Sequence, residues 1–331
     1  MASARHETLR PVPPPLEFGG STVIWATWLY YVEGQTQADV AKILGVSRAS
    51  IANYLAEARH RGLVKVSMES DLLNGISEGR ALTQRFDLQG AMIVPTGADE
   101  TTTPAALRRR LAQAAAQALQ HRLFDGMTIG VAWGRTMNEL AQALPERTLP
   151  ETTVVQVSGS FFDESDTAPE ACTSLIARRL GARCRNFHAP AVLGSRNTRD
   201  ALLAEPVLQR HIERLRRCDV VLLGVGELHG GISWLEDELM PDDLLSEYID
   251  RGACGILIGR LLNAEGREVD GPLAGRQVGM ELADLGASPV RFVVAGGREK
   301  LAAIRATLTG GYATHLVTDD RTAQALLEEI P

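Results

Sequence analysis

The strongest constraint on the fold is an alternation that runs from Leu88 to the end of the chain, in which short continuous apolar runs alternate with helical segments. Strands buried on both faces carry such runs, and helices supply the crossovers of a parallel sheet. The runs predict strands at residues 91–94, 127–131, 153–157, 183–188, 219–224, 255–258, 291–295 and 315–318. The segments between them predict helices at residues 107–121, 136–143, 168–180, 206–217, 242–251, 299–308 and 321–330. We therefore expect an α/β fold with a Rossmann-like, mostly parallel sheet covered on both faces.

Glycine-rich loops follow four of the predicted strands, at residues 130–136, 158–160, 224–227 and 296–300. In an open parallel sheet, ligands bind where the loops at the carboxyl ends of the strands converge. Small residues there let backbone amides and helix N-termini approach an anion. Each loop is weak evidence alone, since parallel sheets need such turns in any case. Together the four predict an anion pocket, with a phosphate as the natural ligand.

Lys300 follows the double glycine of the last loop. It is one of three lysines among 34 basic residues, and the other two lie between residues 34 and 66. We interpret Lys300 as a phosphate or sugar contact, with a solvated surface lysine as the alternative. The loop at Gly224 and Gly226 nearly matches a dinucleotide fingerprint, but His229 stands where the last glycine belongs, which disfavours a nucleotide.

A helix-turn-helix pattern precedes the α/β region. Residues 21–33 form an apolar first helix, and Thr36 begins a second helix with Val40, Ile43 and Leu44 expected on its inner face. Gly45 and the valine after it make the turn. A third helix then begins after a serine cap and continues to about residue 60. The alternative is an ordinary helical hairpin.

The third helix has the two faces of a recognition helix. Ile51, Leu55 and Ala58 are expected to pack inward, while Arg48 and Asn53 suit a phosphate or guanine and an adenine, respectively. Residues 63–68 alternate like the strand of a wing. The predicted DNA-binding residues are Gln37, Ser47, Arg48, Ala49, Ser50, Asn53 and Lys65.

The distribution of charge along the chain supports a division into a DNA-binding module and an α/β region. The formal net charge is −7, but residues 34–66 carry +3, which leaves −10 on the remainder. A basic module on an acidic body is expected of a regulator with a discrete DNA-binding end. The four cysteines are widely spaced, so neither a zinc site nor a disulfide framework is expected. We also expect no cofactor, no metal and no membrane span, and we expect the protein to lie in the cytoplasm.

By its motifs, the chain resembles the SorC family of sugar-binding transcriptional regulators from about Ser21 to Leu327. The motifs that carry the resemblance in the N-terminal region are YVEGQTQ at 31–37, AKILGVSR at 41–48, EAR at 57–59 and GLV at 62–64. Those in the α/β region are WGRT at 133–136, GACG at 252–255, AGG at 295–297 with Lys300, and TDD at 318–320 with TA at 322–323.

The resemblance implies a winged helix-turn-helix joined to a domain similar to sugar-phosphate isomerases, assembled as a homotetramer that binds operator DNA and a phosphorylated sugar or polyol. We expect four segments: a disordered tail at 1–20, a DNA-binding domain at 21–68, a connecting helix at 69–87, and an effector-binding and oligomerisation domain at 88–331. The predicted effector-binding residues are Gly134, Arg135, Thr136, Ser158, Gly159, Ser160, Gly226, Glu227 and Lys300. Ile256 departs from the family, which commonly has an acidic residue there to hold sugar hydroxyls, so Glu227 or Asp163 replaces it or the effector lacks that hydroxyl.

Three functions compete at this point. We favour a transcriptional regulator of a carbohydrate or polyol catabolic operon. The alternative is a sugar-phosphate isomerase-like enzyme with an accessory helical domain, which needs a general base from Asp163, Glu227, His188 or His229. No recognisable dyad joins these residues in the sequence, so we expect no catalytic site. A structural or partner-binding protein is the third option, and it has no use for a basic recognition helix.

Overall fold

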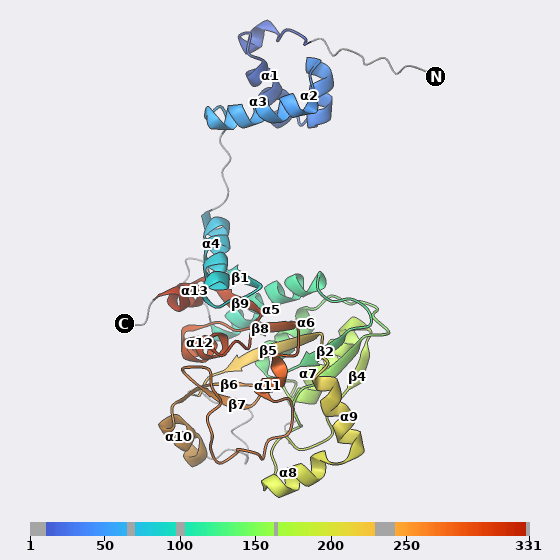
Figure 1. Ribbon diagram of the computed structural model, residues 1–331, viewed down its shortest axis with the longest axis vertical. Coiled ribbons are helices and arrows are strands. Elements are labelled where there is room, and N and C mark those ends of the chain that lie inside the picture. The colour runs from blue at the N-terminus through green and yellow to red at the C-terminus, as the bar shows by residue number, and fades with distance from the viewer. Residues whose placement is uncertain (1–10, 65–69, 97–102, 162–164, 229–241, 329–331) are drawn as a thin grey trace. The chain divides into compact units, whose positions relative to one another are not determined.

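The computed structural model describes residues 11–64, 70–96, 103–161, 165–228 and 242–328. The chain divides into two compact units, Met1–Glu69 and Ser70–Pro331 (Figure 1). The smaller unit contains the 3-10 helix η1 (Leu16–Phe18) and the helices α1 (Thr22–Tyr31), α2 (Gln37–Leu44) and α3 (Arg48–His60). The predicted wing residue Lys65 and residues 66–68 lie outside the described residues.

Each α-helix of the smaller unit begins at a hydroxyl cap. The side chains of Ser21, Thr36 and Ser47 accept hydrogen bonds from backbone amides three residues later, at 3.3, 3.2 and 3.1 Å. Gly45 ends α2 in the left-handed conformation, with φ of 66°, which is the turn that the sequence predicts. The three helices share one apolar core, which contains Trp25, Ala26, Leu29, Val40, Ala41, Leu44, Ile51 and Leu55.

Two expectations about this unit are wrong. Ile43 is 41% exposed, and Ala41 takes the inner position, because it lies one helical turn before the buried Leu44. The tail was expected to be disordered to residue 20, but its described part, residues 11–20, has defined structure. The Phe18 ring lies 6.3 Å from that of Trp25, which gives this segment an apolar partner.

The larger unit is built on the sheet that the alternation predicts. The order β1-β9-β8-β5-β2-β3-β4 is parallel throughout, and the β6–β7 hairpin adds to β5 in the antiparallel sense. Its strands are β1 (Gly90–Val94), β2 (Thr128–Val131), β3 (Thr153–Gln156), β4 (Arg183–Arg185), β5 (Val220–Gly226), β6 (Ala253–Leu257), β7 (Arg260–Asn263), β8 (Val290–Val294) and β9 (His315–Asp319).

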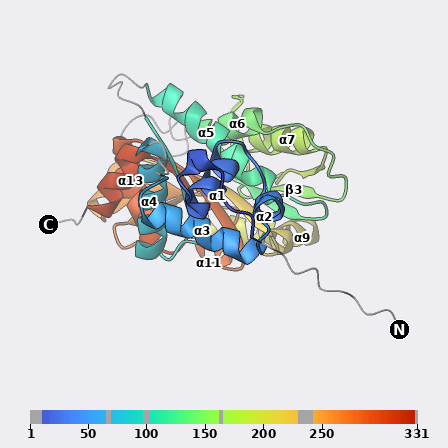
Figure 2. The same ribbon diagram turned by 90° about the horizontal axis from the view of Figure 1, so that it is seen from above.

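Helices cover both faces of this sheet, as expected. Figure 2 shows α5, α6 and α7 along one side, and α12 packs against β5 and β6. The helices and the 3-10 helix η2 are α4 (Ser70–Arg85), α5 (Pro104–Gln120), α6 (Arg135–Ala143), α7 (Pro169–Leu180), α8 (Arg196–Leu203), α9 (Pro206–Leu215), α10 (Asp242–Asp250), α11 (Leu282–Leu285), η2 (Arg298–Lys300), α12 (Leu301–Thr309) and α13 (Asp320–Leu327).

The sequence prediction missed β7, α8 and the short α11. Ile258 and Gly259 connect β6 to β7 with φ of 46° and 80°, so a two-residue turn reverses the chain there. The apolar residues around this turn concealed it in the sequence. Because the turn reverses the chain, β6 and β7 pair in the antiparallel sense. The four cysteines are free, and burial raises the pKa of both the Cys172 and Cys218 thiols to about 12.

Candidate functional site

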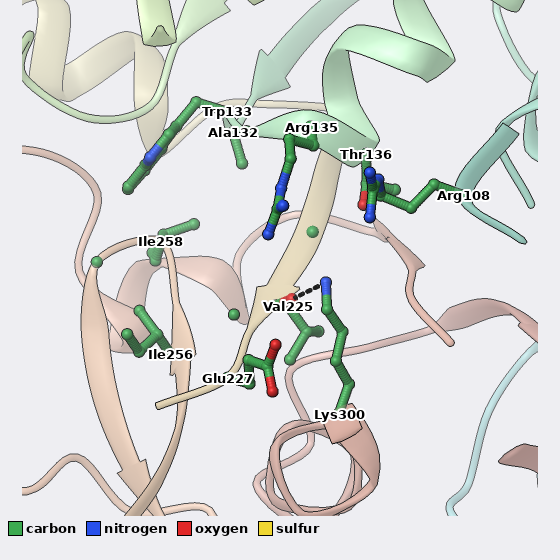
Figure 3. Close-up of a pocket in the computed structure, with 14 residues that line it drawn as sticks. Arg108, Ala132, Trp133, Arg135, Thr136, Val225, Glu227, Ile256, Ile258 and Lys300 are labelled. Atoms are coloured by element: carbon green, nitrogen blue, oxygen red, sulfur yellow. Dashed lines mark hydrogen bonds between the residues drawn. The ribbon is translucent and has the colours of Figure 1, made fainter. Parts of the chain in front are cut away.

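A cavity opens at the carboxyl ends of β2 and β5, beside the 3-10 helix η2 that follows β8 (Figure 3). This is the edge at which the sequence analysis placed a ligand. The cavity is lined by Arg108, Ala132, Trp133, Gly134, Arg135, Thr136, Gly224, Val225, Gly226, Glu227, Ile256, Ile258, Gly259 and Lys300. The first and third glycine loops, and Lys300 of the fourth, therefore line this cavity.

Six of the nine predicted effector residues line the cavity, namely Gly134, Arg135, Thr136, Gly226, Glu227 and Lys300. Ser158 instead lines a small adjoining cavity that shares Trp133, Ile258 and Gly259 with the main one. Gly159 and Ser160 line neither of these cavities. A Cβ on Gly159 would lie 2.6 Å from the Cα of Ala191, so this glycine serves close packing of two backbone segments.

Gly134 places the first turn of α6 at the cavity. Its φ of 98° and ψ of 177° belong to a region that only glycine adopts readily. Its own amide donates to the carbonyl oxygen of Thr167 at 2.9 Å, which fixes the loop. The helix that begins at Arg135 has no side-chain cap, so its N-terminal amides and dipole favour an anion.

Lys300 extends into the cavity from η2. Its ammonium donates a hydrogen bond to the carbonyl oxygen of Val225 at 3.0 Å. Burial lowers the pKa of Lys300, and the Glu227 carboxylate partly offsets this effect. Figure 3 shows the Lys300 ammonium and the Arg135 guanidinium reaching toward the same space from opposite sides. A phosphate in this space would supply the negative charge that both groups face.

Arg108, which was not among the predicted effector-binding residues, reaches the cavity from α5. Its buried Nε atom has no hydrogen-bond partner. Burial lowers the pKa of Arg108, and the positive charge of Arg135 lowers it further. The one signal in the sequence is that Arg108 begins a run of three arginines near the start of a predicted helix. Nothing in that run says which arginine points inward.

The other wall of the cavity is apolar. Trp133 packs against Phe161 with ring centroids 5.5 Å apart, and Ile258 lies beside it in the lining. Ile256, at the position where the family commonly has an acid, is only 4% exposed. Of the two carboxylates considered as replacements, Glu227 lines the cavity and Asp163 lies outside the described residues.

The candidate bases of an enzyme do not come together in the described part of the chain. Glu227 lines the cavity, whereas His188 is exposed and outside its lining. Asp163 and His229 lie outside the described residues. Among the residues that are described, no group of three or more histidines, cysteines and acids could hold a metal ion. None of the helices in the same residues is long and apolar enough to cross a membrane.

The third helix of the smaller unit presents the predicted recognition surface. Ile51, Leu55 and Ala58 are buried, which confirms the predicted inner face. The predicted DNA-binding residues Ser47, Arg48, Ala49 and Asn53 are exposed, and Gln37 and Ser50 are half-buried. Polar and small side chains therefore cover the first turns of α3, as major-groove contact requires.

Comparisons with known proteins cover both units of the chain. A family profile described as "Putative sugar-binding domain" matches residues 71–328. The transcriptional regulator YjhU of Escherichia coli (strain K12) is 33% identical over 317 residues, which cover 95% of this chain and 97% of YjhU. The full-length sorbitol operon regulator SorC from Klebsiella pneumoniae has a TM-score of 0.72 and 25% identity, covering 92% of this chain and 98% of SorC. This chain belongs to the SorC family of sugar-binding transcriptional regulators.

Membership of the SorC family decides between regulator and enzyme. The erythritol catabolism regulatory protein EryD of Brucella abortus (strain 2308) is also similar, at 26% identity over 93% of this chain and 96% of EryD. These relatives are named as transcriptional regulators, and their likeness extends over both units. This SorC-family chain is accordingly a DNA-binding transcriptional regulator with a sugar-binding domain, not an isomerase-like enzyme.

Proposed function

We propose that this SorC-family regulator senses a phosphorylated sugar or polyol in the cavity and controls a carbohydrate or polyol catabolic operon through α3. One observation carries the choice of effector class. Among the lining residues, the side chains of Arg108, Arg135 and Lys300 supply three positive charges against one carboxylate, Glu227. A neutral sugar would leave the excess positive charge of these lining residues uncompensated in a partly desolvated space, which is costly.

The same cavity offers a place for each part of such an effector. The phosphate lies against the first turn of α6, where Arg135 and Lys300 reach it. The carbon skeleton lies against Trp133 and Ile256, since sugars and polyols present apolar C–H groups to such walls. Glu227 accepts hydrogen bonds from hydroxyl groups, the task that an acid at position 256 performs in the family.

The smaller unit supplies the DNA contacts. Asn53 is suited to bidentate pairing with adenine, and Arg48 to a guanine edge or a phosphate. Ser47 and Ser50 bind phosphates at the N-terminus of α3. Relatives named for the sorbitol operon and for erythritol catabolism support a polyol-related operon. We propose a homotetramer that pairs recognition helices on operator DNA in the cytoplasm.

The effector class is tested by thermal shift and calorimetry. The full-length chain is incubated with phosphorylated sorbitol, phosphorylated erythritol and aldose or ketose phosphates, each beside its unphosphorylated counterpart. Stabilisation by a phosphorylated compound alone supports the proposal, because ligand binding to the folded state raises its stability. Equal stabilisation by the free polyol would contradict a phosphate site, and turnover of any compound would contradict the assignment as a regulator.

Arginine variants of one helix make this test specific. Arg108→Ala should abolish the shift caused by the phosphorylated compound. Arg109→Ala is the matched control, because its side chain is exposed on the same helix and does not line the cavity. If both variants lose the shift equally, the effect comes from the general charge of α5 and not from the cavity.

A further inference from the structure

The glycine loop before Lys300 is held by the C-terminal helix of the chain. The amide of Gly297 donates to Asp319 Oδ2 at 3.0 Å and to Thr322 Oγ1 at 2.9 Å. Asp319 and Thr322 are 1% and 0% exposed, so water cannot replace either acceptor. Lys300 follows on the same loop, and its amide donates to the carbonyl oxygen of Gly297 at 3.0 Å.

The same two residues begin α13. Asp319 Oδ1 accepts from the amide of Thr322 at 2.9 Å, and the Thr322 hydroxyl donates to Asp319 Oδ2 at 2.7 Å. Asp319 is therefore both the N-cap of α13 and a hydrogen-bond acceptor for the glycine loop before Lys300. The Asp319 carboxylate accepts three hydrogen bonds, from the Gly297 amide, the Thr322 amide and the Thr322 hydroxyl. A displacement of the loop must therefore either break one of these bonds or move the start of α13.

The far side of α13 contacts α4. Gln324 Nε2 donates to Glu78 Oε1 at 2.9 Å, and Arg85 Nη1 donates to the carbonyl oxygen of Leu327 at the helix end. Figure 1 shows α13 beside α4. In turn α4 is pressed onto β1, because a Cβ on Gly79 would lie only 2.8 Å from the carbonyl oxygen of Ala91. Helix α4 is thus fixed from two sides.

Helix α4 is also the element of the larger unit that lies next in sequence to the DNA-binding unit, which ends at residue 69. We propose that Asp319 and Thr322 are positioning residues that join the Lys300 loop to α4 through α13, so that filling of the cavity is transmitted to the segment that carries the DNA-binding unit. This inference rests on the proposed function of the cavity as an anion site.

Occupation of the cavity would act through Lys300. A phosphate competes with the carbonyl oxygen of Val225 for the ammonium, so Lys300 and its loop shift when the anion binds. The loop carries the Gly297 amide with it, and the shared acceptors pass the shift to the first turn of α13. The Gln324–Glu78 hydrogen bond then passes it to α4, as coupling through packed, hydrogen-bonded elements requires.

Hydrogen exchange measured by mass spectrometry on the full-length chain, with and without inorganic phosphate, tests this connection. Thr322→Val removes the hydroxyl and keeps the shape, and Thr322→Ser restores the hydroxyl. Without phosphate, Thr322→Val should speed exchange about tenfold in the 296–300 loop, α13 and α4, since the lost hydrogen bonds include one to a charged group. Helix α7 serves as the internal control and should not change, and Thr322→Ser should restore most of the protection.

A swap on the surface tests the second step. Gln324→Glu sets a carboxylate against Glu78, and the double variant Glu78→Gln with Gln324→Glu restores a hydrogen-bonded pair. In the unmodified chain, phosphate should slow exchange in the loop, α13 and α4. In Gln324→Glu the slowing should stop at α13, and in the double variant it should return to α4.

The exchange pattern distinguishes failure of the connection from failure of the anion site. Phosphate protection confined to the loop of the unmodified chain would overturn the connection and leave the anion site intact. If phosphate protects no segment, the anion site fails. The connection then stands if Thr322→Val speeds exchange in both α13 and α4 without phosphate, and it falls if only the loop changes.

Discussion

Replacing Lys300 by methionine should weaken phosphate binding while leaving the fold intact. The methionine keeps the length and apolar stem of the side chain and removes the ammonium. That ammonium now donates to Val225 O at 3.0 Å, and a bound phosphate would take over the bond. A hydrogen bond between charged groups contributes about 1.5–3 kcal/mol, which corresponds to a roughly ten- to hundredfold weaker Kd.

Isothermal titration calorimetry measures this loss with the phosphorylated sugar or polyol that gives the largest thermal shift. Arg298→Met is the matched control, because Arg298 is exposed on the same 3-10 helix and does not line the cavity. The control should change Kd less than twofold, and the unphosphorylated compound should bind both variants as weakly as it binds the unmodified chain. An unchanged Kd in Lys300→Met would refute the assignment of this lysine to the phosphate.

Lys300 also gives two opposite pH trends. Burial lowers its pKa below the ordinary value of 10.5, so the unfolded chain holds this proton more tightly than the folded one. Stability of the ligand-free chain should therefore rise with pH between the lowered pKa and about 10.5, and Lys300→Met should remove that rise. Phosphate affinity should fall over the same interval as the ammonium loses its proton. Urea denaturation and calorimetry across this interval measure the two trends.

Further predictions concern four single positions. Arg48→Ala should lower the slope of log K against log salt by about one, if its contact is to a phosphate, whereas Asn53→Ala should relax base preference at one position and leave the slope unchanged in filter binding. Gly134→Ala should cost about 1–3 kcal/mol in urea denaturation because of its backbone conformation, whereas Gly194→Ala, which has open space and an ordinary φ, should cost much less. Ser47→Ala should cost about 1 kcal/mol through the lost cap of α3, and an unchanged unfolding midpoint would contradict that role.

The alternation of apolar runs and helical segments was enough to predict the parallel sheet, because strands that are buried on both faces have continuous apolar sequences. It was not enough to locate the β6–β7 turn. Ile258 adopts a positive φ that isoleucine seldom takes, and tertiary packing rather than local propensity must hold it there. Ile43 shows the same limit on a helix, since an apolar residue at the margin of the inner face does not reveal which way it points.

The site was predicted in part for a related reason. A glycine after a strand can make room for a ligand or allow two backbone segments to approach closely, and the sequence alone does not distinguish the two roles. Gly134 places helix α6 at the cavity, whereas Gly159 packs against residues 189–191. Arg108 was missed because its contribution depends on the orientation of α5. The contacts between Asp319, Thr322 and Gly297 join residues 22 and 25 positions apart, and no local pattern indicates such pairs.

Base-specific DNA binding by α3 should respond to an anion bound in the larger unit. Its most direct test is the affinity of the full-length chain for its own promoter and for random duplex at moderate salt, each with and without the phosphorylated compound that stabilises the chain most. We predict a clear preference for the promoter and a change in that preference when the compound is added. Equal affinity for both duplexes under every ligand condition would contradict the account.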